Sequence, residues 1–292
     1  MSAPQDRKPS LRGASKVTGS AGRISLDARE TVVVTLLSDF GAADTYAGQM
    51  KGAILAVAPE AVLVDLTHAV PPQDVRTGAF HLWAAVEAFP AGTVHLAVVD
   101  PGVGTNRRAL AARAKRGDLF VGPDNGLLMA AINRLGGLIA AVQLEEPRFF
   151  RDRVSFTFHG RDVFGPIAGY LARGGRLEEL GPPLTEVDRS VDFARPEKDG
   201  QRVLGEVLHI DVYGNLVSNI PASMLPQAFE VRVGNRVIRD APHGSYQDVE
   251  SGSPLALIGS NGLLDISVRD GSAKNLLRAR VGTKLSVEPS SW

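Results

Sequence analysis

The sequence predicts an α/β protein in two parts: an amino-terminal, mostly parallel sheet between helices, then a small antiparallel β-barrel domain. Two observations lead to this prediction. Continuous aliphatic and β-branched runs, typical of strands buried on both faces, alternate with helical patterns along the first half of the chain. After residue 200 the pattern changes to short strand-like runs separated by turn residues, without a long helical period.

The first half contains strand-like runs at residues 31–37, 61–67, 93–99, 109–114 and 119–121. Helical patterns fall at residues 45–58, 75–89, 127–135 and 162–173. Asp44 and Asp74 are placed to cap the first two helices. Since a helical crossover returns the chain to the same edge of a sheet, the strands are predicted to be mostly parallel.

Four of these strand-like runs end in polar loops rich in Gly and Pro, with the sequences SDFG, THAVPP, DPGVG and GPDNG. The carboxyl ends of parallel strands meet at one edge of a sheet, and ligands of such sheets bind beyond that edge. We therefore expect the polar residues of these loops to gather on one rim of the first domain.

The polar, Pro-containing stretch 176–201 is expected to be a linker. It separates an α/β domain at residues 31–175 from a β-barrel domain at residues 202–292, with strand-like runs at 203–211, 216–219, 229–233, 255–258, 263–268 and 284–287. Residues 1–30 are polar and rich in Ser, Gly and basic residues. A disordered tail is the preferred interpretation, with a transit peptide as the alternative.

Composition limits the possible chemistry. The 32 Lys and Arg residues balance 32 Asp and Glu residues, so net charge gives no indication of nucleic acid or an anionic membrane as partner. The absence of cysteine excludes disulfides and thiolate chemistry and agrees with a cytoplasmic location. No apolar run approaches the roughly 20 residues of a membrane helix. His209 and Asp211 could face one side of a strand, but without an evident third ligand no metal site is expected.

Three polar clusters carry the chemical signal. Asp100 begins the segment DPGVGTNRR, His159 lies in FTFHGRD before a helix, and Asp39 lies in SDFG after the first strand-like run. The glycines after Asp100 permit a tight turn, so that Arg107 can fold back toward the carboxylate. Taken singly, each fragment also fits a plain turn or a structural histidine. Their occurrence together, in this order, is the informative feature.

These segments resemble the S-adenosylmethionine (SAM) hydroxide adenosyltransferase family, relatives of fluorinase and chlorinase. The resemblance extends from about residue 32 to about residue 287 and includes TLLSDFGAADTYAGQMKG, GTVHLAVVDPGVGTNRR, SFTFHGRDVFGP and LHIDVYGNLVSNI. It implies the two domains already predicted and a homotrimer, with each active site between one subunit's first domain and its neighbour's second. The implied reaction is hydrolysis of SAM to adenosine and L-methionine, with SAM as the substrate and no cofactor.

The resemblance assigns Asp100, Arg107 and His159 to the family's hydrolytic triad and Asp39 to binding of the ribose diol. Arg107 can stabilise a developing hydroxide through its N–H donors. His159, with an unperturbed pKa of roughly 6.5, can accept a proton while Asp100 orients its partners. Equally consistent is a carboxylate–guanidinium pair that holds the hydroxide, with His159 only positioning it. The two oxygens of Asp39 suit two vicinal hydroxyl groups.

In the second domain, the resemblance implies contacts with the methionine and adenine parts of the substrate. The corresponding residues are Asp211, Tyr213, Asn215, Ser260, Asn261, Arg269 and Tyr246. Tyr213 stands where fluorinase has Phe, in a loop that is one residue shorter. Asn261 stands where fluorinase has Arg, so the contact with the methionine carboxylate is expected to be weaker or differently made.

Two alternative functions remain at this point. The first is a halogenase that uses chloride, and position 160 does not exclude it because chlorinase shares Gly160, where fluorinase has Ser. The second is a non-catalytic protein that binds adenosine or another nucleoside on the same fold. The intact triad argues against the second, because a binding protein needs no Arg and His beside the reacting carbon.

Overall fold

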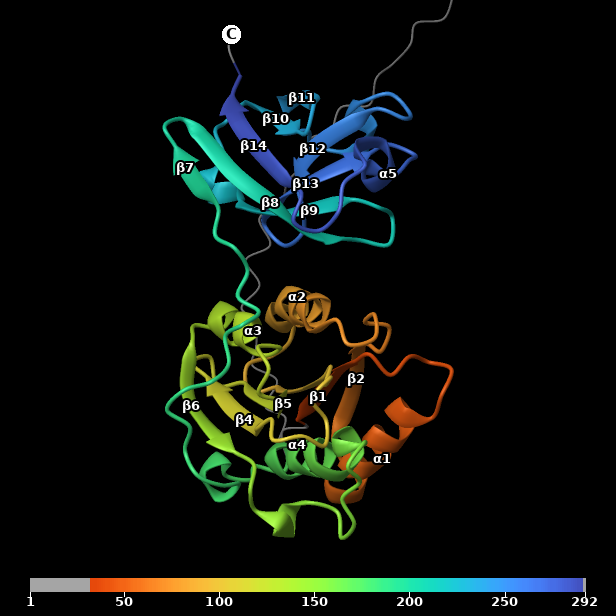
Figure 1. The fold of residues 1–292 in the computed structure, drawn as a ribbon, viewed down its shortest axis with the longest axis vertical. Coiled ribbons are helices and arrows are strands. Elements are labelled where there is room, and N and C mark those ends of the chain that lie inside the picture. Colours follow the sequence, from red (N-terminus) through yellow and green to blue (C-terminus); the bar gives the residue numbers. More distant parts are fainter. Residues whose placement is uncertain (1–31, 291–292) are drawn as a thin grey trace, which may run out of the picture. The chain divides into compact units, whose positions relative to one another are not determined.

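The computed structural model describes residues 32–290 (Figure 1), so the predicted tail at residues 1–30 lies outside the described residues. The first sheet has six strands in the order β2-β1-β3-β5-β4-β6. Its strands are β1 (Val33–Ser38), β2 (Val62–Thr67), β3 (Val94–Val98), β4 (Ala109–Ala114), β5 (Leu119–Pro123) and β6 (Leu138–Gln143). Strands β2, β1, β3 and β5 are parallel, and β4 is antiparallel to both of its neighbours. The predicted mostly parallel sheet is confirmed.

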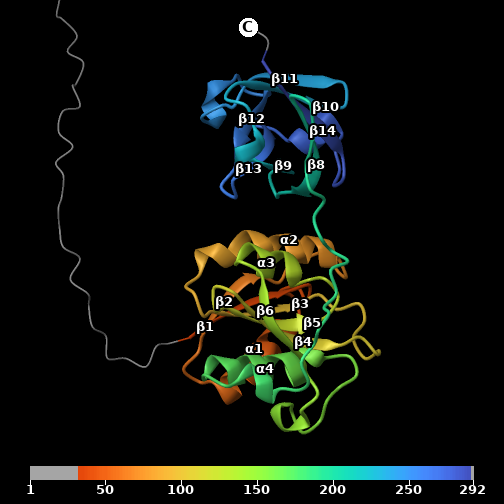
Figure 2. The ribbon, with the colours of Figure 1, turned by 90° about the vertical axis from the view of Figure 1, so that its left-hand side faces the viewer.

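Helices cover both faces of this sheet (Figure 2). They are α1 (Tyr46–Val57), α2 (Val75–Ala85), α3 (Met129–Arg134) and α4 (Gly165–Ala172). One face carries α1 and α4, and the other carries α2 and α3. Adjacent residues of β1 point to opposite faces: Leu36 packs in the core with α1 and α4, and Leu37 packs in the core with α2 and α3. Burial on both faces explains why this strand is a continuous apolar run in the sequence.

The two predicted helix caps have different outcomes. Asp74 caps α2, because its Oδ1 accepts a hydrogen bond from the backbone N–H of Thr77 at 3.0 Å. Asp44 does not cap α1, so that prediction was wrong. Thr45 occupies the N-cap position and makes no side-chain cap bond. A capping side chain acts from the residue directly before the first helical residue, and α1 begins one residue later than predicted.

The second sheet is antiparallel and has eight strands. They are β7 (Glu197–Asp199), β8 (Arg202–Ile210), β9 (Leu216–Pro221), β10 (Phe229–Val233), β11 (Arg236–Ala241), β12 (Pro254–Ile258), β13 (Leu263–Val268) and β14 (Lys284–Pro289). The path runs β11-β10-β14-β8-β9-β13-β12, with β7 paired to β8. The backbone N–H of His243, just after β11, donates to the carbonyl of Ala256 in β12 at 2.8 Å. The sheet is therefore almost closed on itself, which confirms the barrel-like fold.

Two strands, β6 and β11, were missed in the sequence, and β7 lies within the stretch expected to be a linker. Strand β6 reads LIAAVQ, and its central alanines give little strand signal; it forms because it pairs with β4. Strand β11 reads RVIRDA and pairs with β10. Within residues 32–290, no helix is long and apolar enough to cross a membrane.

The close packing of strands β3 and β5 leaves no room for a side chain at Gly122 in β5. A Cβ atom there would collide with the backbone carbonyl of Ala97 in β3, which cannot move without disturbing the sheet. We expect Gly122→Ala to lower the free energy of unfolding by about 2 kcal/mol or more. As a control, Gly52→Ala on α1 adds a Cβ that meets nothing within 4 Å, and the higher helix propensity of Ala should preserve stability. Equal calorimetric midpoints for the two variants would contradict this explanation.

Candidate active site

Two acidic residues follow the carboxyl ends of neighbouring parallel strands. Ser38 at the end of β1 is in register with Val98 at the end of β3. Asp39 comes one residue after Ser38, and Asp100 comes two residues after Val98. Both carboxylates therefore lie at the same edge of the first sheet, where the parallel strands present their polar loops.

The structure brings Asp100, Arg107 and His159 into direct contact. Arg107 Nε donates to both carboxylate oxygens of Asp100, at 2.9 and 3.0 Å. Arg107 Nη2 also donates to Asp100 Oδ2 and lies 2.8 Å from Nδ1 of His159. The side chains of Arg107 and Asp100 are only 11% and 6% exposed, so their ion pair is largely shielded from water. Charge-assisted pairs in such surroundings are stronger than exposed ones.

The turn after Asp100 returns the chain so that Arg107 can reach the carboxylate. The backbone N–H of Val103 donates to the carbonyl of Asp100 at 3.2 Å, and Thr105 Oγ1 donates to the carbonyl of Gly102 at 2.7 Å. Gly104 adopts a φ of 76°, and a Cβ atom on it would collide with the carbonyl of Phe156. Glycine is therefore required here both by the backbone conformation and by contact with the loop that precedes His159.

His159 directly precedes a π-helical turn, η3 (Gly160–Phe164), that leads into α4. An arginine side chain has only donors, so Nδ1 of His159 accepts from Arg107 and the ring proton resides on Nε2. Burial, and then the positive charge of Arg107, lower the pKa of His159. The ring is therefore neutral at neutral pH, and its remaining polar group, Nε2–H, is a donor.

A pocket of about 220 Å³ gives access to part of this trio. Arg107 and His159 line it, together with Arg108, Ala109, Gln143, Leu144, Phe150, Val154 and Val163. Asp100 is not among the lining residues. Within residues 32–290, no group of three or more His, Asp or Glu side chains is arranged to hold a metal ion. The polar side chains that line this pocket are Arg107, Arg108, Gln143 and His159.

Asp39 is held by a different set of contacts. Its Oδ2 accepts a hydrogen bond from the backbone N–H of Gln73 at 2.8 Å. Behind it, Ser38 Oγ lies 2.7 Å from Nδ1 of His68, and His68 Nε2 lies 3.1 Å from Asp65 Oδ1. His68 stands in no recognisable motif of the sequence. Its position in the THAVPP loop, on the predicted rim, was the available indication.

An aromatic cluster lies beside the trio and was also missed in the sequence. Phe158, the residue before His159, packs edge-on against Phe40 and Tyr46, with ring centroids 5.7 and 5.3 Å away. A Cβ atom on Gly160 would lie 3.0 Å from the Phe40 ring, so glycine lets the SDFG loop approach the π-helical turn. The segments around residues 40 and 160 are thus packed together at this rim.

The second domain gathers three of the sequence-predicted residues into one turn between β8 and β9. Asp211 Oδ1 accepts from the backbone N–H groups of Tyr213 and Asn215, at 2.9 and 2.8 Å. Asp211 Oδ2 accepts from the side-chain amide of Asn215 at 2.8 Å. Tyr213 is 75% exposed, so the turn places an aromatic residue at the surface of the second domain.

The other sequence-predicted residues lie on neighbouring loops of the second domain. Ser260 and Asn261 form the turn between β12 and β13. Arg269 follows β13, and its Nη1 donates to the carbonyl of Val249 at 2.8 Å. Tyr246 begins a short 3₁₀ turn and is about half exposed. Among the described residues, no hydrogen bond or ion pair joins any of these side chains to the trio in the same chain.

Asp265 is a further ionisable residue that the sequence analysis missed. It lies on β13 between aliphatic neighbours, and its Oδ1 is buried with no hydrogen-bond partner among the described residues. Burial, and secondly the nearby charge of Asp211, raise the pKa of Asp265 to about 7. A carboxylate within an aliphatic strand was the signal that could have identified it.

The raised pKa of Asp265 predicts that the stability of the folded protein depends on pH. The folded protein binds this proton more tightly than the unfolded chain, so stability falls as pH rises from about 3.8 to about 7 and then stays level. We expect Asp265→Asn to raise the thermal midpoint by about 2 °C or more at pH 8, with a smaller gain at pH 4. Asp270→Asn, at a neighbouring carboxyl that is 66% exposed, is the control. The same gain at both pH values would show that ionisation of Asp265 is not the cause.

These features define a two-domain protein with an α/β sheet, a β-barrel, and an Asp–Arg–His trio with a shielded Asp–Arg ion pair at the carboxyl edge of the first sheet. Residues 34–181 match the SAM hydroxide adenosyltransferase N-terminal domain, and residues 205–286 match the C-terminal domain of the same family. The chain belongs to the SAM hydroxide adenosyltransferase family. The resemblance found in the sequence is thereby confirmed.

Similar proteins agree with this assignment. The (R)-S-adenosyl-L-methionine hydrolase of Salinispora arenicola is 42% identical, over 87% of this chain and 97% of its own length. The protein of the same name from Thermus thermophilus is 40% identical, over 85% and 96%. A fluorinase of Actinoplanes is more distant, at 30% identity over 67% and 74%. An uncharacterized conserved protein of solved structure from Thermotoga maritima has a TM-score of 0.80 and 33% identity, over 87% of this chain and 99% of its own.

Proposed function

We propose that this protein is an S-adenosyl-L-methionine hydrolase that forms adenosine and L-methionine. The observation that carries the proposal is the bridge by Arg107, whose Nη2 contacts both Asp100 and Nδ1 of His159 at a solvent-accessible pocket. Relatives that are 40–42% identical over most of their length bear the name of this activity. The reaction uses SAM as its substrate and needs no separate cofactor.

The chemical difficulty lies in the nucleophile rather than in the leaving group. Water attacks C5′, a C5′–O bond forms, and the C5′–S bond breaks with its electron pair retained by sulfur. Methionine leaves as a neutral thioether, so no acid is required, and one proton of the attacking water is released. The site must hold this water in line with the C–S bond and stabilise its developing hydroxide character.

The arrangement of the trio suggests how its members share this task. The lone pair of Nδ1 in His159 is already used by Arg107, which leaves Nε2–H to orient the oxygen nucleophile. Arg107 supplies positive charge to the developing hydroxide, and Asp100 fixes the guanidinium through its Nε and Nη2. We therefore favour the guanidinium–carboxylate pair as the group that holds hydroxide, with His159 as a positioning donor.

The remaining contacts complete the proposed substrate site. Asp39 would accept hydrogen bonds from the two ribose hydroxyl groups. The loops of the second domain would contact methionine and adenine, through Asp211, Tyr213, Asn215, Ser260, Asn261, Arg269 and Tyr246. We further propose a cytoplasmic homotrimer in which a neighbouring subunit supplies these loops, as the resemblance to the family implies.

The decisive experiment is a product analysis with purified full-length protein, SAM and ¹⁸O-labelled water. We expect adenosine and methionine in equal amounts, with the label in the 5′-hydroxyl of adenosine. A parallel reaction in chloride should give the same products. Formation of 5′-chloro-5′-deoxyadenosine would instead identify a halogenase, and tight adenosine binding without SAM cleavage would identify a nucleoside-binding protein.

The assigned roles predict different kinetic defects for two variants. Arg107→Ala should lower kcat by about 10²–10³-fold, because a donor to the developing anion is lost. Asp39→Ala should mainly raise KM, because the ribose contact forms in the ground state as well as in the transition state. Arg113→Gln removes a partly exposed arginine on β4 and serves as the control. Normal kcat in Arg107→Ala, or a large fall in kcat at unchanged KM in Asp39→Ala, would refute the respective role.

A further inference from the structure

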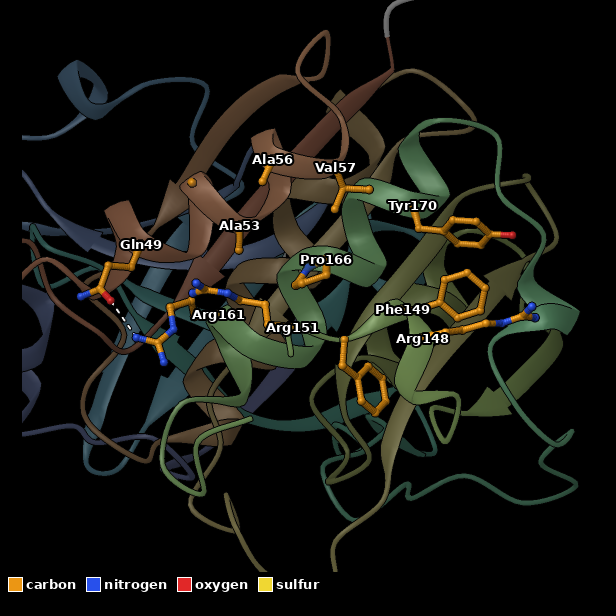
Figure 3. A pocket seen from close by; sticks show the side chains of 12 residues that line it. Gln49, Ala53, Ala56, Val57, Arg148, Phe149, Arg151, Arg161, Pro166 and Tyr170 are labelled. Atoms are coloured by element: carbon orange, nitrogen blue, oxygen red, sulfur yellow. Dashed lines mark hydrogen bonds between the residues drawn. The ribbon is translucent and has the colours of Figure 1, made fainter. Parts of the chain in front are cut away.

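A second pocket, of about 460 Å³, lies between α1, α4 and the short turn η2 (Pro147–Phe149) (Figure 3). Its volume falls in the range of about 300–1,000 Å³ that is usual for small-molecule sites. The proposed reaction uses none of its lining residues. Phe150 alone lines both this pocket and the pocket of the trio. We call it the α1–α4 pocket.

The floor of the α1–α4 pocket is made of small and apolar residues. Gly52, Ala53 and Ala56 of α1 contribute to it, and Pro166 of α4 lies opposite. A Cβ atom on Gly52 would meet nothing within 4 Å, so the space above this part of α1 is open. Small side chains on the facing helices thus leave room for a flat ligand.

One wall of the pocket is aromatic. Phe149 and Tyr170 pack with their ring centroids 4.4 Å apart, and both rings line the pocket. The guanidinium carbon of Arg148 lies 4.7 Å from the Phe149 ring centroid. Figure 3 shows Phe149, Tyr170 and Arg148 close together on one side of the pocket. Such a wall suits a planar ring, which can stack on aromatic and guanidinium faces.

The charge that lines the pocket is positive. Its charged side chains are Arg148, Arg151 and Arg161, and no carboxylate lines it. Arg161 Nε and Nη2 donate at 2.6 and 2.9 Å to the completely buried Asp162, and Arg161 Nη1 donates to Gln49 Oε1 at 3.0 Å, which leaves two of its five N–H donors unused. Arg151 is only 3.6 Å from the same carboxylate, so two guanidinium groups share one negative charge.

Arg148 has only a long contact with a carboxylate, since Glu146 lies 3.8 Å away. A neighbouring hollow adds Arg153 to the same surface, together with Asp152. Even when these carboxylates are counted, the pocket retains N–H donors without a close anionic partner. Paired guanidinium groups recognise phosphate oxygens through parallel N–H donors.

We propose that the α1–α4 pocket binds a nucleotide. The phosphate would lie between Arg151 and Arg161, which Figure 3 shows side by side. The nucleoside ring would lie over the small floor toward Phe149 and Tyr170. This site is distinct from the trio and does not depend on the proposed hydrolase activity.

The test uses GDP as the probe in isothermal titration calorimetry with the full-length protein. A guanine nucleotide is chosen because adenine compounds would also enter the proposed SAM site. We expect a Kd tighter than about 1 mM for GDP and weaker binding of guanosine and of inorganic phosphate, since each supplies only half of the contacts. Absence of GDP binding at millimolar concentration would overturn the proposal.

Two variants locate the binding site. Arg151→Gln removes one phosphate donor while Arg161 still pairs with Asp162, and Gly52→Leu fills the open floor. Each should weaken GDP binding by about tenfold or more, Arg151→Gln through the loss of one charge-assisted hydrogen bond and Gly52→Leu through steric exclusion of the ring. Arg113→Gln and Arg107→Ala should leave the affinity for GDP unchanged.

Three results would overturn this location. Equal GDP affinity in all variants would place binding elsewhere, and loss of binding only in Arg107→Ala would place it at the trio. A change in oligomeric state of Arg151→Gln, measured by sedimentation velocity, would show that this face contacts a second copy of the chain. Thermal midpoints close to the parent protein would confirm that Arg151→Gln and Gly52→Leu remain folded.

Discussion

The ion pair between Asp100 and Arg107 is the interaction on which the rest of the site depends. Its three donor contacts fix the guanidinium in one plane, and that plane directs Nη2 at His159. The contact between Arg107 and His159 also sets the tautomer of His159. Nδ1 accepts a hydrogen bond from Arg107, so the ring proton must be on Nε2. A single shielded ion pair thereby decides which atoms of the site are donors.

The parallel sheet supplies the positions that this pair needs. Paired strands β1 and β3 end beside each other, so the loops that carry Asp39 and Asp100 start from a common edge. Gly104 then lets the turn after β3 pack on the loop that precedes the π-helical turn. The fold thus converts residues distant in sequence into a local cluster, and glycine at the contact point is a steric requirement.

The two pockets of the first domain show how one segment can take part in two environments. Phe150 lines both pockets. Asp162 holds the segment that follows Phe150: its Oδ2 accepts a hydrogen bond from the backbone N–H of Ser155 at 2.9 Å, and its backbone carbonyl accepts one from the backbone N–H of Arg151 at 3.0 Å. The segment 150–162 is therefore held by the backbone carbonyl and the buried carboxylate of Asp162. In the second domain, two carboxylates have contrasting surroundings. Both oxygens of Asp211 accept hydrogen bonds within its turn, whereas Oδ1 of Asp265 is buried without a hydrogen-bond partner.

The sequence by itself determined the two-part fold and the edge of the sheet where the polar loops gather, because buried parallel strands and glycine turns are local patterns. The members of the trio were named through the resemblance to a family, and the structure brought them together. Tertiary structure alone decided the rest. Strand β6 forms because it pairs with β4, and Asp44 does not cap α1 because the helix begins one residue later than predicted. The pKa of Asp265 is raised because packing of the second domain excludes water from its carboxylate. The protonation state of His159 and the α1–α4 pocket were equally invisible, because both result from contacts between segments that spacing along the chain does not encode.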